Sequence, residues 1–337
     1  MTLKTSNWTI KKSGSPSRAD VHVNRPLTDI SIAYVQSQDS FVAWNTFPVI
    51  TVGKQSDRYF EYDRGFFNRS EMGVRAPSSE SRGMNFAIDN TPTYYCPINA
   101  LHIDIDDEMN DNSDEGIDLE RDAATILSLQ TLIFAEKQFA ANYFKTGVWA
   151  NDVTGVSASP GAGEVLQWDN PSSSPIEDVR TAKTTIREST GFEPNKLVLG
   201  RRVWDKLVDH PDIVGRIDRG QTSGVALVNR QAVAALFEVD SVEVMSAIEN
   251  TAAEGAANSH SFIGGKKAML AYSNPNPSKL MPSAGYTFAW KGRGPRGFQV
   301  SRYRMDPIKS NRIEVEASFQ MKKVGADLGY FWDTIVA

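Results

Sequence analysis

The longest regular pattern of apolar positions runs from residue 117 to residue 146 and predicts a single helix. At 1.5 Å per residue, such a helix is a rod of roughly 45 Å. Its middle is apolar nearly all round, so we expect it to be buried on more than one side. We expect Ser113 or Asp114 to cap its first turn. Further acidic side chains there suit the positive end of the helix dipole, namely Asp118, Glu120 and Asp122.

A second group of patterns alternates helices with short apolar strands. Pro175 opens a helix, and Gly191 closes it. A further helix is predicted at 230–237, and a strand follows at 241–245. This part of the chain is therefore predicted to be an α/β unit.

Within that unit lies a strand, a glycine and a helix, the arrangement on which many proteins bind nucleotides. The apolar strand 197–199 ends at Gly200, and one face of the next helix is apolar, formed by Val203, Trp204, Leu207 and Val208. The turn offers Arg201 and Arg202, however, with neither further glycines nor a Lys-Ser pair. The pattern leaves open whether this unit holds a ligand.

Residues 54–90, named here the charged hairpin, combine dense, balanced charge with aromatic residues that favour strands. Such a segment cannot build a core alone, so we predict a long hairpin that rests on another surface. Its bases are Lys54, Arg58, Arg64, Arg69, Arg75 and Arg82, and its acids are Asp57, Glu61, Asp63, Glu71, Glu80 and Asp89. The alternating run 98–106 then predicts a strand that leads back.

Three other stretches complete the chain. Residues 1–30 are polar without a sustained period, which predicts an extended arm. Residues 151–175 are rich in Gly, Ser and Pro and are predicted to be a linker and a domain boundary. The stretch 311–337 is strand-like.

The composition is that of an ordinary folded protein. The chain has 337 residues, of which 40% are hydrophobic and 23% charged, so two or more domains are expected. It lacks both an apolar run of membrane-spanning length and a signal-type N-terminus, so we expect it to mature in the cytoplasm. The single Cys96 is interpreted as a small buried hydrophobe. The net charge of −5 argues against a protein that coats nucleic acid over its whole surface.

Several motifs resemble ligand-binding sites, but the residues around them argue against that function. The sequence GRGPRG at 292–297 matches a dinucleotide fingerprint, but Pro295 removes an amide and a strand follows, so we interpret it as a hairpin loop. Residues 111–122 match a calcium loop only in part, and their acids are better explained by the first turn of the long helix. The four histidines have no metal-binding spacing. No catalytic constellation emerges, and we predict a protein that is not an enzyme and has no cofactor or metal.

A basic stretch with interleaved aromatic residues lies near the C-terminal end. Its cations are Lys291, Arg293, Arg296, Arg302 and Arg304, and its aromatic residues are Trp290, Phe298 and Tyr303. Such a patch can contact nucleic acid. We favour the alternative that it is a charged hairpin that pairs with acids on another subunit.

The remaining features all concern contact with other chains, and in this order they resemble the major capsid proteins of tailed phages. The resemblance spans most of the sequence and implies an α+β protein with the Hong Kong 97-like capsid fold. Its motifs are loose: the segments 195–213, 260–272 and 313–337 resemble parts of that family's fold. By this resemblance the chain divides into an N-terminal arm (1–30), a P-domain entry (31–48), an E-loop (49–92), a P-domain (93–158) with a spine helix (117–146), an A-domain (159–299) and a return to the P-domain (300–337).

The resemblance also implies a function and partners. The chain would assemble into hexamers and pentamers of an icosahedral head that encloses double-stranded DNA, with only weak contact between DNA and the interior. It would be assembled in the host cytoplasm and would reside in the virion capsid. The short arm implies a separate scaffolding protein, and the family implies a portal and leaves a decoration protein open. In such a shell Arg201 and Arg202 need not bind phosphate.

Contacts between subunits are expected at charged or apolar positions outside the predicted cores. The candidates are Arg58, Glu61, Arg64, Arg69, Glu71, Arg75, Arg82, Ile133, Arg293 and Arg296. Two alternatives remain open: an encapsulin-type shell, which has the same fold but encloses cargo enzymes, and a soluble α/β enzyme.

Overall fold

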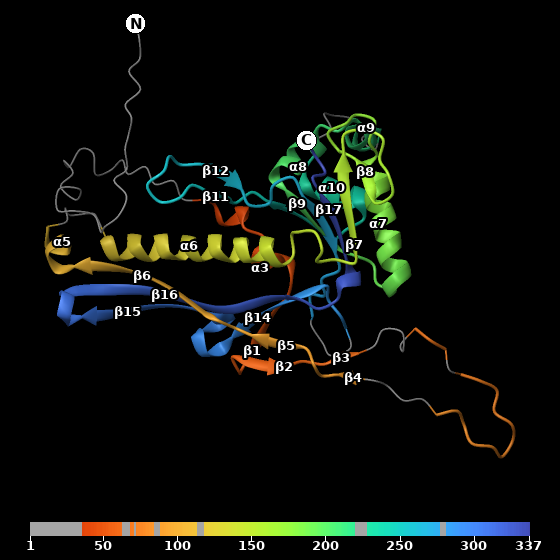
Figure 1. Ribbon diagram of the computed structural model, residues 1–337, viewed down its shortest axis with the longest axis horizontal. Helices are drawn as coiled ribbons and strands as arrows, with labels where there is room; N and C mark the ends of the chain where they lie inside the picture. The colour runs from red at the N-terminus through yellow and green to blue at the C-terminus, as the bar shows by residue number, and fades with distance from the viewer. Residues whose placement is uncertain are drawn as a thin grey trace, which may run out of the picture.

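The computed structural model describes residues 36–62, 68–70, 72–83, 88–112, 118–219, 228–276 and 281–337. The predicted N-terminal arm lies outside these residues. Figure 1 shows an elongated molecule in which a long helix and long strands lie along the main axis, beside a second unit of sheet and helices. Two sheets, one of five strands and one of six, organise the chain.

The five-stranded sheet is built around one long strand, β16 (Ser310–Lys323). Its order is β1-β14-β16-β15, and β6 also pairs with β16. The other strands are β1 (Val49–Val52), β6 (Ile98–Asp106), β14 (Gly285–Trp290) and β15 (Phe298–Met305). The predicted strand 98–106 is therefore confirmed with its bounds.

Residues 291–297 do not form the hairpin loop that the sequence predicted. β14 and β15 both run antiparallel to β16, along different parts of it, so they share one direction and cannot be partners in a hairpin. Two short 3-10 helices, η2 (Lys291–Arg293) and η3 (Pro295–Gly297), join them. Gly297 has φ 70°, and a Cβ there would lie 2.3 Å from the carbonyl oxygen of Ser318, so only glycine lets the chain pass this close to β16.

The long helix α6 (Leu119–Asn142) packs along this sheet. It is shorter than predicted at both ends, and its cap is neither Ser113 nor Asp114: the Asp118 carboxylate accepts the Arg121 N–H at 3.1 Å. A short helix, α5 (Asp107–Asp111), leads from β6 toward it. The N-terminal half of α6, the sheet and Met109 of α5 share an apolar cluster that consists of Ile105, Met109, Ala123, Leu127, Ile313 and Val315.

The six-stranded sheet has the order β10-β9-β13-β17-β7-β8. Its strands are β7 (Asn151–Val156), β8 (Glu164–Leu166), β9 (Lys196–Gly200), β10 (Ser241–Met245), β13 (Ala268–Ala271) and β17 (Gly329–Asp333). The helices of this unit are α7 (Pro175–Thr190), α8 (Arg201–Val208), α9 (Pro211–Arg219) and α10 (Arg230–Phe237). The predicted bounds of α7, α10 and β10 are confirmed, and Gly191 ends α7 with φ 79°.

The predicted linker at 151–175 is wrong. This stretch contains β7 and β8, which pair side by side in the six-stranded sheet, and it contains Trp168, which is fully buried. The two sheets also exchange strands across the predicted boundaries. β14 lies within 159–299 yet belongs to the five-stranded sheet, and β17 lies within 300–337 yet belongs to the six-stranded sheet.

The strand, glycine and helix unit has its predicted form but leaves no room above Gly200. A Cβ at Gly200 would lie 2.4 Å from the carbonyl oxygen of Gly265 and 2.8 Å from that of Gly264. The backbone between β12 (His260–Phe262) and β13 therefore occupies the space where a phosphate would approach a nucleotide-binding turn. Gly200 serves close packing of backbone on backbone.

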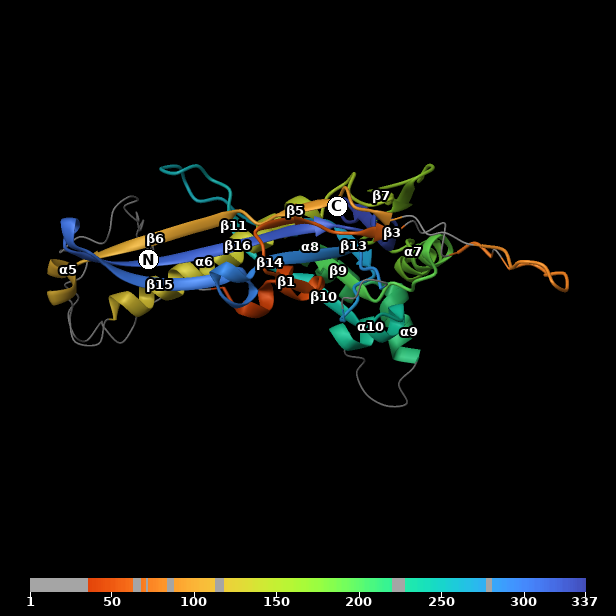
Figure 2. The same cartoon turned by 90° about the horizontal axis from the view of Figure 1, so that it is seen from below.

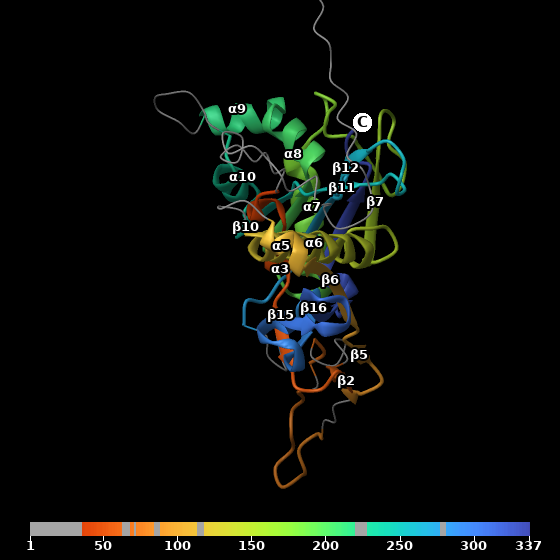
Figure 3. The same cartoon turned by 90° about the vertical axis from the view of Figure 1, so that its left-hand side faces the viewer.

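The charged hairpin projects from the body. Its base consists of the pairs β2 (Ser56–Arg58) with β5 (Thr93–Tyr95), and β3 (Glu61–Tyr62) with β4 (Ile88–Asp89). Beyond them, residues 68–70 and 72–83 form no helix or strand, and their side chains are exposed. We call these residues the tip. Seen end-on in Figure 3, the hairpin extends on the side opposite α8 and α9.

Gly200→Ala should destabilise the folded subunit. Because the new methyl group meets two backbone carbonyls at less than van der Waals distance, we expect a loss of about 1–3 kcal/mol in the free energy of unfolding. Gly215→Ala, in α9, is the matched control: nothing lies within 4 Å of its Cβ position, so it should stabilise the subunit by about 0.5–1 kcal/mol. Urea unfolding of unassembled subunits measures both. Equal effects would contradict the packing role of Gly200.

Candidate functional site

The base of the charged hairpin is fixed on β14 by aromatic packing. The ring of Tyr94 stacks on that of Phe288, with centroids 4.8 Å apart and planes 9° apart. Tyr59 packs against the same Phe288 ring at 5.6 Å. Cys96 is fully buried beside them, as predicted, and burial raises the pKa of its thiol to about 11. The hairpin therefore starts from a rigid base.

Of the seven hairpin positions predicted as contact residues, four are exposed, one is half-buried and two lie outside the described residues. Arg58, Arg69, Arg75 and Arg82 are exposed, Glu61 is half-buried on β3, and Arg64 and Glu71 are not described. The structure does not gather them into one cluster on their own chain. Sequence reasoning by charge also missed Met72 and Val74, which are 96% and 106% exposed in the tip. The signal was a Met-Gly-Val run within a charged segment.

Helix α6 is buried on two sides in its C-terminal half only. There the sheet covers one side, and α3 (Ala43–Thr46), whose Trp44 also packs on Phe319 of β16, covers a second side. The predicted burial on more than one side is therefore confirmed for this half. The N-terminal half leaves Ile126 50% exposed. The predicted contact residue Ile133 lies between these halves and is half-buried.

A buried carboxylate holds α3 against α6. Glu136 is fully buried, and its oxygens accept the Val42 N–H at 3.0 Å and the Ala43 N–H at 2.9 Å. These amides begin α3 and have no partner within so short a helix. Burial raises the pKa of Glu136 to about 7, although the two backbone hydrogen bonds act in the opposite direction. A titratable group thus lies at the joint between α3 and the long helix.

Within the subunit, the basic stretch at 290–304 pairs largely with acids of its own chain. Arg293 lies 3.1 Å from Glu316, Arg302 lies 2.7 Å from Glu120, and Arg304 forms a two-pronged contact with Asp107. Arg296 is exposed and has φ 61°. Most of the positive charge of this stretch is therefore neutralised within the chain.

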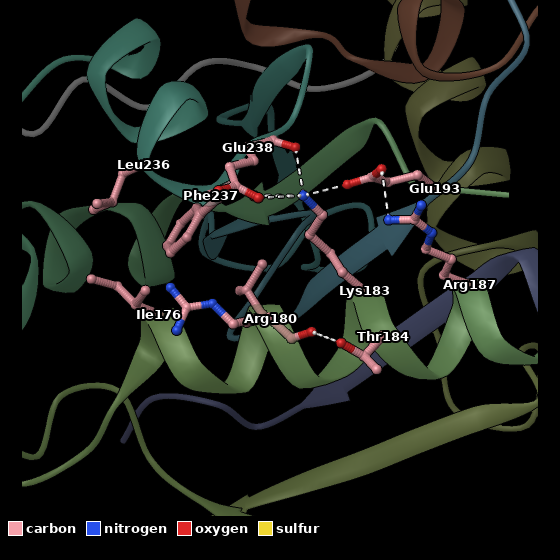
Figure 4. A pocket seen from close by; sticks show the side chains of 10 residues that line it. Ile176, Arg180, Lys183, Thr184, Arg187, Glu193, Leu236, Phe237 and Glu238 are labelled. Carbon is pink, nitrogen blue, oxygen red and sulfur yellow. Dashed lines mark hydrogen bonds and ion pairs between the residues drawn. The ribbon is translucent and has the colours of Figure 1, made fainter.

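A small cavity of about 150 Å³ lies between α7 and α10 (Figure 4). The Lys183 ammonium enters it with 9% of its side chain exposed and donates to the carbonyl oxygen of Glu238 at 2.8 Å. It also lies 3.0 Å from the Glu193 carboxylate and 3.4 Å from that of Glu238. Lys183 thus satisfies the carbonyl end of α10, and we assign it a structural role.

One serine lies beside a histidine without forming a catalytic pair. Ser173 Oγ is 3.1 Å from His210 Nε2, and both residues are buried. His210 Nδ1 accepts the Asp212 N–H, so Nε2 carries the proton and cannot act as a base toward Ser173. Ser173 donates instead to the carbonyl oxygen of Asn170 at 2.8 Å.

In the ranges that the structure describes, no group of three or more His, Cys, Asp or Glu side chains is placed to hold a metal ion. Of the histidines, His102 and His260 are exposed, and His22 lies outside these ranges. None of the helices within them combines the length and apolarity needed to cross a bilayer.

Known proteins are similar to this chain over nearly its full length. Residues 166–281 match the family of phage major capsid protein E. The major capsid protein of Pseudomonas phage JBD67 is 27% identical, and the alignment covers 95% of this chain and 99% of that protein. A phage-related protein of Bordetella bronchiseptica RB50 superposes with a TM-score of 0.66 at 24% identity, covering 89% of this chain and 93% of that one.

More distant structures share the fold. The capsid protein of the cyanophage P-SCSP1u has a TM-score of 0.60 at 10% identity, with 95% and 98% of the two chains covered. The SrpI encapsulin of Synechococcus elongatus PCC 7942 has a TM-score of 0.55 at 10% identity, with 93% and 95% covered. The chain therefore has the predicted α+β, Hong Kong 97-like capsid fold.

Glu136→Gln should flatten the pH dependence of subunit stability. Folding raises the pKa of Glu136 from 4.5 to about 7, so protonation of Glu136 stabilises the folded subunit. This contribution to the free energy of unfolding is complete below pH 4.5, and roughly 3 kcal/mol of it is lost as the pH rises to 7. The glutamine oxygen can still accept the α3 amides but does not ionise. Urea unfolding of unassembled subunits from pH 4.5 to 8 compares the slopes. A wild-type slope of the opposite sign would mean that the amide hydrogen bonds outweigh burial.

Lys183→Met should cost about 1–3 kcal/mol of unfolding free energy, because it removes the donor from the buried carbonyl oxygen of Phe237 and from the part-buried one of Glu238. Arg187→Met is the matched control one turn along α7. Arg187 contacts the same Glu193 at 3.6 Å but is 69% exposed, so its loss should cost less than about 1 kcal/mol. Thermal unfolding of both variants measures the difference, and comparable losses would refute the structural role of Lys183.

Proposed function

We infer that this relative of phage major capsid proteins forms the shell of a phage head. Hexamers and pentamers of the chain close into an icosahedral shell around double-stranded DNA. One observation carries this function: the chain aligns with a phage major capsid protein over 95% of its own length and 99% of that protein. The capsid fold agrees with it.

The arrangement of the elements also supports an assignment of segments to domains. We assign residues 1–30 to an N-terminal arm, the charged hairpin to the E-loop, α6 with the five-stranded sheet to the P-domain, and the six-stranded sheet with α7–α10 to the A-domain. The rigid hairpin base supports this assignment, since a projecting loop must start from a fixed point in order to reach a neighbour.

Partners follow from the same role. A separate scaffolding protein would guide assembly, a portal would occupy one vertex, and a decoration protein would be optional. Shells would form in the host cytoplasm and persist in the virion. The net charge of −5 supports weak contact with DNA at the inner surface, because a strongly basic lining would hold the genome too tightly for release.

Two other functions have less support. An encapsulin-type shell shares the fold, but the SrpI encapsulin is 10% identical to this chain, whereas the phage major capsid protein is 27% identical. A soluble enzyme needs a reactive group. In the Ser173–His210 pair the proton of His210 is on Nε2, which faces Ser173, so His210 cannot act as a base toward that serine. Electron microscopy of the expressed protein tests the proposal: closed shells are expected, and a small soluble oligomer would overturn it.

Replacing residues 63–87 with a short Gly-Ser turn should abolish closed shells and leave the subunit folded. The tip adds no contact to either core, whereas the β2–β5 pairing and the aromatic base remain. Particle counts by electron microscopy, beside circular dichroism of the variant, measure the two properties separately. Intact shells without the tip would remove its role in assembly, and an unfolded variant would place it in a core.

A further inference from the structure

Residues 36–47, named here the strap, join the long helix to the six-stranded unit. The strap contains η1 (Gln38–Ser40) and α3. Figure 2 shows it in red near the middle of the long axis, beside α6. Because its two halves are bonded to different units of the molecule, its docking determines how firmly those units are held together.

The N-terminal half of the strap is bonded to the backbone that follows β10. The Gln36 side chain donates to the carbonyl oxygen of Ile248 at 2.8 Å and accepts the Ile248 N–H at 2.9 Å. The carbonyl oxygen of Ser40 accepts the Ser246 N–H at 3.2 Å and the Ala247 N–H at 3.1 Å. These hydrogen bonds connect the strap to the six-stranded unit and involve no ionisable side chain.

The C-terminal half of the strap is held on α6 and β16. The Trp44 ring packs edge-on against Phe319, with centroids 4.9 Å apart, and Phe47 packs on Tyr143 at 4.7 Å. Between these aromatic contacts, the Glu136 carboxylate accepts the two amides that begin α3. Glu136 is fully buried, so an opening of the strap would expose it to water.

Charged side chains border the strap, but burial governs Glu136. Residues 41–47 contain no ionisable side chain, and the cluster that they share with α6 and both sheets is apolar. Burial is the largest cause of the raised pKa of Glu136, and the two α3 amides oppose it. The charged neighbours are Asp39 in η1, the pair of Lys137 with Glu249 of β11 (Ile248–Asn250), and Lys196 of β9, which donates to the carbonyl oxygen of Asn45 and interacts with Glu243 of β10.

We propose that Glu136 is a pH-dependent latch: the strap stays docked while this carboxyl group is neutral, and its ionisation favours a local opening in which the strap lifts from α6 and from the chain after β10. A buried carboxylate is unfavourable without a cation, and lifting the strap hydrates it. The pKa of Glu136 is about 7 when docked and 4.5 when exposed, so docking is strongest below pH 4.5 and weakens as the pH rises to 7. The latch belongs to the single subunit and goes beyond the proposed shell.

Hydrogen exchange of the unmodified, unassembled full-length chain tests the latch directly. After correction for the intrinsic effect of pH on exchange, protection of the strap amides should fall at least about tenfold between pH 5 and pH 8. The amides of Ala247 and Ile248 have acceptors on the strap, so their protection should fall with it. Equal protection of the strap at the two pH values would overturn the proposal.

The same experiment separates a local opening from unfolding of the whole subunit. Leu197, Val198 and Leu199 of β9 are fully buried in the middle of the six-stranded unit, and their amides report global unfolding. At pH 8 the strap should exchange while these β9 amides remain protected. Exchange of the strap and β9 together would mean that Glu136 acts only on global stability, and the latch would be overturned.

Two matched variants identify the carboxyl group responsible. Glu136→Gln keeps an acceptor for the α3 amides but does not ionise, so strap protection should change by less than about twofold over the same pH range. Glu249→Gln is the control, because this neighbouring carboxylate pairs with Lys137 at 2.7 Å instead of with the strap, and the variant should keep the wild-type pH dependence. Retention of that dependence by Glu136→Gln, or its loss in Glu249→Gln, would refute the latch. Neither result bears on shell formation, which electron microscopy tests separately.

Discussion

The structure depends on a single strand, β16, which lies at the centre of the five-stranded sheet. It pairs with β14, β15 and β6, and its alternate side chains form the apolar surface on which α6 and α3 pack. The same strand holds the base of the charged hairpin, since the Gln320 side chain accepts the Tyr95 N–H at 2.9 Å and Lys322 donates to the carbonyl oxygen of Thr93. Fourteen residues in one extended conformation thus link helix, sheet and projection.

This arrangement makes a rigid body with one long projection, which suits a shell protein. A subunit that repeats many times can close a shell through contacts that are weak individually, provided that each is presented in a fixed direction. The stacked Tyr94 and Phe288 rings and the buried Glu136 joint supply that direction near the hairpin and near α3. The bonds that fix geometry are therefore buried, whereas the side chains available to neighbours remain exposed.

The sequence predicted those elements whose start, end or periodicity is marked by their own residues. α7 has a proline at its start and a left-handed glycine at its end, and β6 alternates over its full length, so both were predicted with their bounds. The strands β7 and β8 were missed because glycine, serine and proline are typical of linkers, and their strand identity depends on pairing with the distant β17. The loop at 291–297 was misassigned for the same reason: its direction is set by β16, which comes later in the chain.

The candidate contact residues show a related limit, because the sequence reveals a charge but not its partner. Arg293, Arg302 and Arg304 looked available for another subunit, yet each reaches an acid on a different element of its own chain. Apart from these pairs, Arg75 and Arg82 are exposed in the hairpin tip at one end of the molecule, and Glu108 and Asp111 are exposed near α5 at the other end. Exposed ion pairs alone bind weakly. In a shell of the proposed kind, charge would therefore orient the approach of two copies, and the affinity would come from apolar and backbone groups that formal charge does not reveal.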